Sequence, residues 1–203
     1  MHVCVLLLIG VSLCGCKSFE RLPHYQEYRD GLLPGDGSVR TDGYYYLVRP
    51  IEFKLQKDLG AKQETIVTFF FQDGSCHRSL WQADDSITRV VERIRLWFDS
   101  ERGARQSRDG FGWALYRMLC DTIELEQYTP VNGTNQVHWS RMIVQNDSTI
   151  ELLGAYHPKK GLLSDGVDRT PIHRLMVFRP SSWKPDSTDF FRLNESFIRA
   201  QSR

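Results

Sequence analysis

Short hydrophobic stretches separated by turn residues recur along the chain and predict β-hairpins. The clearest pair is Thr65-Ile-Val-Thr-Phe-Phe-Phe-Gln72, which is followed by Asp73-Gly74 and then by residues 75–81. β-branched and aromatic residues favour strands, and Asp-Gly between two such stretches is a strong hairpin signal. Residues 44–48 and 173–179 are also rich in strand formers, so we expect two further strands there.

A weak internal repeat predicts two more hairpins. Trp113 is followed by Asp121 and Trp139 by Asp147, and each Asp precedes a hydroxyl residue and the triplet Ile-Glu-Leu. We expect each copy to form two strands around an Asp-containing turn, with the carboxylate accepting backbone N–H groups. The hairpins would cover residues 111–128 and 137–154, joined by a link at residues 129–136 that contains the turn residues Pro130, Asn132 and Gly133.

One helix is predicted over residues 85–98. Apolar side chains recur there at helical spacing and would form one buried face: Ile87, Val90, Val91, Ile94, Trp97 and Phe98. Asp84 or Asp85 can cap the free amides at its start, and the arginine-rich opposite face would be solvated. Residues 100–109 lack this periodicity and predict a loop.

Consecutive aromatic residues at 44–46 and 69–71 must point alternately to the two faces of a sheet. One face would form the core, and the other would be covered by the helix, by a second sheet or by a ligand. We therefore predict a mainly β fold with one principal helix. Residues 41–203 would form a single antiparallel meander of about seven to ten strands, curved or closed as a lipocalin-like barrel.

The amino-terminal segment predicts export and lipid anchoring. Residues 3–13 are almost wholly apolar, which suits a signal peptide and is too short to span a bilayer. The following Leu13-Cys14-Gly15-Cys16 resembles the bacterial lipobox. This resemblance implies a lipoprotein signal peptide at residues 1–15, acylation of Cys16 by palmitate-like chains, and a lipidated tether at residues 16–40. An ordinary signal peptide or a short membrane helix stays open as an alternative.

Two or three acyl chains would hold the protein on a membrane, since each buried CH₂ contributes about 0.8 kcal/mol. Lys17 follows the cysteine, where retention at the inner membrane would often require Asp. The lipobox resemblance therefore implies the outer membrane. The sequence leaves open whether the protein faces the periplasm or the outside.

Charge and motif content narrow the function classes. The chain has 26 Lys and Arg residues against 25 Asp and Glu, which argues against nucleic-acid binding. There is no Gly-x-Ser-x-Gly elbow, phosphate loop or dinucleotide fingerprint, and the histidines lack metal-ligand spacing. We therefore expect no catalytic residue, no metal ligand and no cofactor. Cys76 and Cys120 are a candidate disulfide in an exported chain, the alternative being two separate thiols.

A family resemblance extends over most of the mature chain. The lipobox, the run from Arg40 to Tyr45, the Phe-rich strand before Asp73-Gly74, Trp113 with Asp121-Thr-Ile, and Lys184-Pro-Asp-Ser-Thr188 resemble the small uncharacterised lipoproteins of Bacteroides-type bacteria. The resemblance implies an envelope lipoprotein with an antiparallel, lipocalin-like β fold and no known catalytic residues. The Gly-x-Trp signature of the first lipocalin strand is missing, so the comparison with lipocalins is architectural.

Four Asp-Ser or Asp-Thr sites also resemble the O-glycosylation sequence of these bacteria, and the candidate acceptors are Ser86, Thr122, Ser148 and Ser187. Turn and cap chemistry explains the same residues without sugar.

The expected function is a noncatalytic envelope module that binds a protein partner or supports an assembly. The alternatives are a carrier of a small hydrophobic ligand and an uncharacterised hydrolase.

Overall fold

The computed structural model describes residues 39–50, 63–82, 84–108, 112–131, 134–157, 161–162 and 175–186. Nine strands and two helices lie in these ranges. The strands are β1 (Gly43–Pro50), β2 (Gln63–Phe70), β3 (Ser75–Gln82), β4 (Trp113–Leu119), β5 (Thr122–Val131), β6 (Thr134–Asn146), β7 (Thr149–His157), β8 (Gly161–Leu162) and β9 (Leu175–Pro180). The helices are α2 (Ile87–Phe98) and α3 (Glu101–Arg108).

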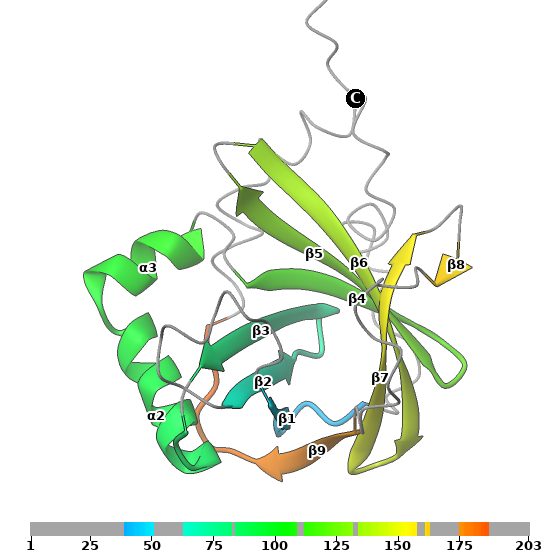
Figure 1. Ribbon diagram of the computed structural model, residues 1–203, viewed down its shortest axis with the longest axis horizontal. Coiled ribbons are helices and arrows are strands. Elements are labelled where there is room, and N and C mark those ends of the chain that lie inside the picture. Colours follow the sequence, from blue (N-terminus) through cyan, green and yellow to red (C-terminus); the bar gives the residue numbers. More distant parts are fainter. Residues whose placement is uncertain are drawn as a thin grey trace, which may run out of the picture.

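Eight of these strands close into an antiparallel barrel (Figure 1). The sheet order is β6-β5-β4-β3-β2-β1-β9-β7-β8, and a pairing between β6 and β7 closes the ring. On β1, Tyr45 lies opposite both Thr68 of β2 and Phe178 of β9. The prediction of a mainly β, lipocalin-like antiparallel fold is confirmed.

The three predicted hairpins are present, but the predicted link between the last two is wrong. The ladder of β5 and β6 continues from Thr122 opposite Ile143 as far as Val131 opposite Thr134. Most of residues 129–136 therefore belong to strands. Pro130 misled the prediction, because a proline removes only one donor and this strand pairs along its length despite it.

The interior of the barrel is the larger hydrophobic core. Alternate residues of the strands point inward and pack on one another, as the pleat requires. The buried members include Tyr45, Leu47, Ile66, Phe70, Cys76, Tyr116, Ile123, Leu125, Met142, Ile150, Leu152, Met176 and Phe178.

A second core lies outside the barrel, between the sheet and α2 (Figure 1). Val90 and Ile94 of the helix are fully buried there, against residues that include Tyr44, Val67, Phe69, Phe71, Trp113 and Leu115. The consecutive aromatic residues thus serve both cores, Tyr45 and Phe70 inside and Tyr44, Phe69 and Phe71 under the helix. The helix covers the outer face, as predicted.

The predicted start of the helix needs a correction. Ser86, rather than Asp84 or Asp85, is the N-cap, and its hydroxyl accepts a hydrogen bond from the backbone N–H of Arg89. Asp85 instead pairs with Arg93 at 2.9 Å. The helix begins at Ile87, so Ser86 rather than either aspartate occupies the N-cap position.

The predicted loop at residues 100–109 is mainly a second helix, α3. Ser100 joins the two helices, because its hydroxyl accepts from the N–H of Gly103 at 3.0 Å and donates to the carbonyl of Trp97 at 2.7 Å. A Cβ on Gly103 would lie 1.7 Å from that carbonyl, so the sharp corner needs glycine. Periodicity missed α3 because its sequence, ERGARQSR, has no apolar stripe.

The turn chemistry follows prediction at one turn and differs at two. At Asp73-Gly74 the carboxylate accepts from the N–H of Ser75 at 2.9 Å, and Gly74 has φ of 87°. In the β6–β7 turn Asn146, not Asp147, accepts from the N–H of Ser148. Asp121 accepts from the hydroxyl of Thr122, and Cys120 takes the positive φ of that turn. The carboxylate–amide bond predicted for Asp121 and Asp147 is therefore found at neither turn, whereas Asp73, for which only a tight turn was predicted, forms one.

Candidate functional site

One end of the barrel interior is filled by aromatic rings. Phe70 packs edge-on against Tyr116 with ring centroids 4.9 Å apart, and Tyr45 does so against Phe178 at 5.2 Å. The hydroxyl of Tyr116 donates to the carbonyl of Phe71 at 2.8 Å, and burial raises its pKa. This part of the interior is a packed core.

Farther along the same inner wall the side chains become polar. Pairing and alternation place Thr68 of β2 and Arg78 of β3 opposite each other, two positions from Phe70 and Cys76. Ile66 and Leu80 lie two positions farther along β2 and β3, and Glu64 lies two positions beyond Ile66 on β2. Glu64 forms an ion pair with Arg49 of β1.

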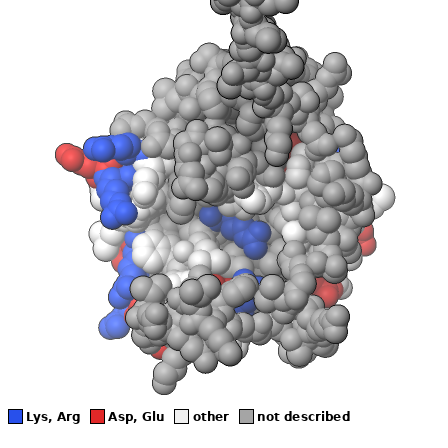
Figure 2. Space-filling view, turned by 45° about the horizontal axis from the view of Figure 1, so that its top comes forward, with Lys and Arg blue, Asp and Glu red and all other residues white. Residues whose placement is uncertain are grey.

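Leu80 is 52% exposed although it lies on the inner face, because β3 and β4 pair only through Ser75, Cys76 and His77. β3 and β4 are therefore separated beside Leu80. In the tilted view of Figure 2, basic side chains lie in a depression near the centre of the molecule.

A groove of about 460 Å³ lies outside the barrel, between α2 and the segment that follows β9. Its lining includes Tyr44 of β1, Val91 of the helix and Trp183. Trp183 packs at right angles to Phe69, with ring centroids 5.7 Å apart. The groove thus has an aromatic floor that belongs to the outer core.

The apolar surface continues from the groove along the outer faces of β1 and β9. Tyr46 contacts Tyr44 at 6.2 Å between ring centroids and lies opposite Val177. Val48, Leu175 and Val177 are 41%, 42% and 44% exposed. We call the groove together with Tyr46, Val48, Leu175 and Val177 the outer apolar surface.

Basic side chains border this surface. Arg89 and Arg95 line the groove with one acidic residue, Glu92. Arg95 lies only at 4.0 Å from Glu92 and from Asp99, so both pairs are loose. Arg179 of β9 lies over the ring of Tyr46 at 5.5 Å.

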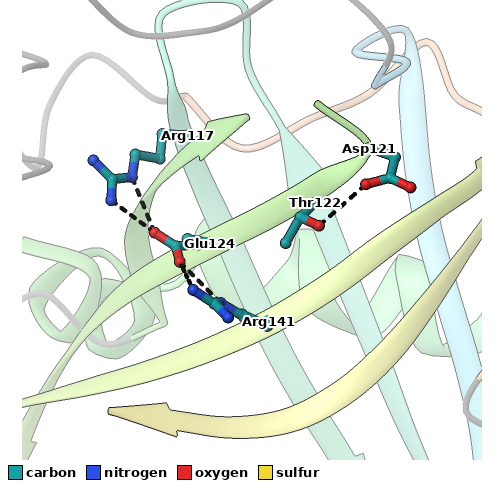
Figure 3. A network of polar contacts seen from close by, with 5 residues as sticks. All are labelled: Arg117, Asp121, Thr122, Glu124 and Arg141. Carbon is teal, nitrogen blue, oxygen red and sulfur yellow. Dashed lines mark hydrogen bonds and ion pairs between the residues drawn. The ribbon is translucent and has the colours of Figure 1, made fainter. Parts of the chain in front are cut away.

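A buried ion-pair network lies elsewhere on the barrel (Figure 3). Glu124 of β5 lies between Arg117 of β4 and Arg141 of β6 and binds both guanidiniums. Burial raises the pKa of Glu124, but the hydrogen bonds from Arg141 and Arg117 outweigh it and lower the pKa below its usual value. The network joins three neighbouring strands, which is sufficient reason for these residue types.

The segment after β9 is tied back to the barrel by Lys184. Its ammonium donates to the carbonyls of Thr41 at 2.6 Å and Phe70 at 2.7 Å, and lies 4.1 Å from the centroid of Phe71. Burial lowers the pKa of Lys184. This contact fixes Trp183 beside the groove.

The candidate disulfide is wrong in this structure. Cys76 and Cys120 are both free, Cys76 buried and Cys120 exposed. Cys76 lies opposite Ala114, whereas Cys120 follows the far end of β4, roughly 20 Å along the strand. A disulfide needs Cα atoms within about 7 Å.

The other predicted site residues fall into two groups. Ser86 and Ser148 are exposed, Thr122 is partly exposed, and all three also serve a cap or a turn. They do not lie in the groove lining. Cys16 and Ser187 lie outside the described residues, so acylation and the fourth glycan site stay predictions.

The inner-wall pair Thr68 and Arg78 was missed by the sequence reasoning. Alternation along β2 could have revealed it, because Thr68 lies on the same face as Ile66 and Phe70. The continuous run of apolar residues in this strand obscured that alternation. His77, in the predicted strand at residues 75–81, lies in the outer core with its ring 5.0 Å from Trp113 and 4.8 Å from Phe98.

In comparisons with protein-family models, curated proteins and solved structures, no match to this chain was found. Among the described residues, no group of three or more His, Cys, Asp or Glu side chains is placed to hold a metal ion. No helix in the part of the chain that the structure describes is long and apolar enough to cross a membrane.

Proposed function

We propose that this protein is a noncatalytic binding module of the bacterial cell envelope, held in the outer membrane by acyl chains on Cys16. It docks a partner protein on the outer apolar surface. The anchor rests on the lipobox resemblance, and the docking site rests on the geometry of β1, β9 and α2. A filled aromatic interior beside a solvent-exposed apolar surface favours a partner outside the barrel.

One observation carries the proposal, namely the continuity of the outer apolar surface. Val48 and Val177 lie on paired strands beside Tyr46, and Tyr46 adjoins the groove that holds Trp183. Scattered exposed apolar side chains need no explanation, whereas a contiguous apolar patch marks an interaction surface. An extended apolar segment can lie along the strands and place one side chain in the groove.

The charges at the border specify the partner further. Arg89 and Arg95 at the groove outnumber Glu92, and Arg179 adds a third cation next to Tyr46. A partner segment that combines apolar and acidic residues complements this border. The module therefore selects an acidic, apolar polypeptide segment.

Site-specific photo-crosslinking in the producing cells tests the docking site. A benzoylphenylalanine at Val48 should give one discrete protein adduct, because that position lies inside the outer apolar surface. The matched control is Leu119, which is also exposed but lies at the end of β4. A second substitution, Val177→Arg, should abolish the adduct, whereas Leu119→Arg should leave it.

Equal adducts at Val48 and Leu119, or an adduct that survives Val177→Arg in a folded variant, would reject the docking site. Replacing Arg89 and Arg95 with Gln should weaken the adduct and change thermal unfolding little, because both side chains are more than half exposed and their ion pairs are loose. The alternative of a small ligand is favoured by one separate observation, the polar pair Thr68 and Arg78 on the inner wall.

A further inference from the structure

The inner wall carries an unusual pair of polar groups just beyond the aromatic core. Thr68 is fully buried, and among the described residues no partner forms a hydrogen bond with its hydroxyl. Arg78 lies directly opposite it on β3, and its backbone N–H donates to the carbonyl of Gly112. Within the described chain no carboxylate or carbonyl accepts a hydrogen bond from its guanidinium.

The charges around Arg78 do not balance. Glu64 is the only carboxylate that strand alternation places on the described inner wall, and Arg49 already pairs with it. Burial lowers the pKa of Arg78 and the positive charge of Arg49 lowers it further, against the opposing effects of Cys76 and Glu64. A guanidinium stays protonated under these conditions, so a half-buried cation lacks an anion.

The surroundings limit the shape of a ligand at this pair. Toward Cys76 the interior is closed by Phe70 and Tyr116. In the other direction the wall offers Leu80, which is exposed where β3 separates from β4. An anion at Arg78 can therefore extend an apolar portion only outward, across Leu80.

We infer that Thr68 and Arg78 form a binding site for a small anionic amphiphile whose head group lies on the inner wall and whose apolar portion covers Leu80. The guanidinium supplies several N–H donors to a carboxylate or phosphate oxygen, and the threonine hydroxyl supplies another. The site lies on the inner wall, whereas the outer apolar surface lies outside the barrel, so it is independent of the partner docking proposed above.

Calorimetric titration of the full chain, produced without acylation, tests the inference with three probes. Octanoate carries both a charge and an apolar portion, octanol only the apolar portion, and acetate only the charge. We expect octanoate to bind at least about tenfold more tightly than either other probe, since the free energy of a hydrogen bond to a charged group corresponds to about a tenfold change in affinity. Inorganic phosphate and octyl phosphate extend the comparison to a phosphate head group.

Three variants separate recognition from a structural role. Arg78→Gln should reduce octanoate binding to the level of octanol and leave octanol binding unchanged. Arg78→Lys keeps the charge but loses the planar fork, and should give intermediate affinity. Thr68→Val, which is nearly isosteric, should weaken octanoate binding about threefold. Arg89→Gln, at an exposed helix position, is the matched control and should bind octanoate as the wild type does.

Thermal unfolding without ligand provides the second readout. Removing an unpaired, half-buried charge should leave Arg78→Gln at least as stable as the wild type. A large loss of stability would mean that the guanidinium holds the fold together, and would overturn the inference. Equal binding of octanoate and octanol, unchanged octanoate binding in Arg78→Gln, or no octanoate binding at millimolar concentration would each overturn it as well.

Discussion

Glu124 accepts a hydrogen bond from Nε of Arg141 at 2.8 Å, although the side chain of Glu124 is only 1% exposed. The two residues lie directly opposite each other on β5 and β6, and Arg117 on β4 binds the other carboxylate oxygen. The buried charge is thus matched on both sides. The carboxylate of Glu124 therefore links three adjacent strands, β4, β5 and β6.

This arrangement predicts a pH-dependent stability. The pKa of Glu124 is lowered in the folded protein, so its contribution is fully present above the pKa of the unfolded chain, about 4.5. It is lost as the pH falls through the lower, folded value. Glu124→Gln should lower the free energy of unfolding at pH 7 by on the order of 3 kcal/mol, because two guanidiniums lose their carboxylate.

Urea denaturation at several pH values measures both effects. Relative to the wild type, Glu124→Gln should show a weaker loss of stability as the pH falls below about 4.5. Glu151→Gln is a control, because Glu151 is bonded to Gln145 at the surface. Parallel pH curves for the wild type and Glu124→Gln would refute the assignment of the lowered pKa.

The packing of α2 on the barrel gives a second prediction. Ile94 is fully buried in the outer core, so Ile94→Ala should lower the free energy of unfolding by about 2–5 kcal/mol. Leu96, on the same helix, is 58% exposed, and Leu96→Ala should change stability by no more than about 0.5 kcal/mol. Similar losses for both variants would place the helix in a different orientation.

The two cysteines of the barrel should differ in reactivity. Cys120 is exposed, whereas burial raises the pKa of the Cys76 thiol and hides it from reagents. A maleimide added to the folded protein should label Cys120 alone, and Cys76 should react only after denaturation. Peptide mapping by non-reducing mass spectrometry checks this. A Cys76–Cys120 peptide pair would contradict the geometry.

Lipid attachment is predicted at Cys16 and can be tested in cells. A clickable fatty acid should label the wild type, and Cys16→Ser should remove both the label and the membrane association. Cys14→Ser is the matched control, because Cys14 precedes the expected cleavage site, and this variant should stay labelled. Label retained in Cys16→Ser would assign the anchor elsewhere.

The local pattern of residues was sufficient for most individual elements. Strand formers on both sides of Asp73-Gly74 predicted β2 and β3, and the spacing from Ile87 to Phe98 predicted α2. These signals act over a few residues, since a pleat, a tight turn and a helical face each depend on near neighbours. The helix α3 was not predicted, because its start depends on the Ser100 cap and on Gly103 rather than on apolar spacing.

Only the tertiary structure decided how the strands surround one another. Pairing of β1 with β9 and of β6 with β7 closes the barrel, and the first of these joins residues far apart in the chain. That closure determines which charges lose water. The sequence does not distinguish Arg78 from an exposed arginine, yet on the inner wall it lies opposite Thr68, and the nearby carboxylate of Glu64 pairs with Arg49. Desolvation depends on every strand around a side chain, so the chain order alone could not reveal the site.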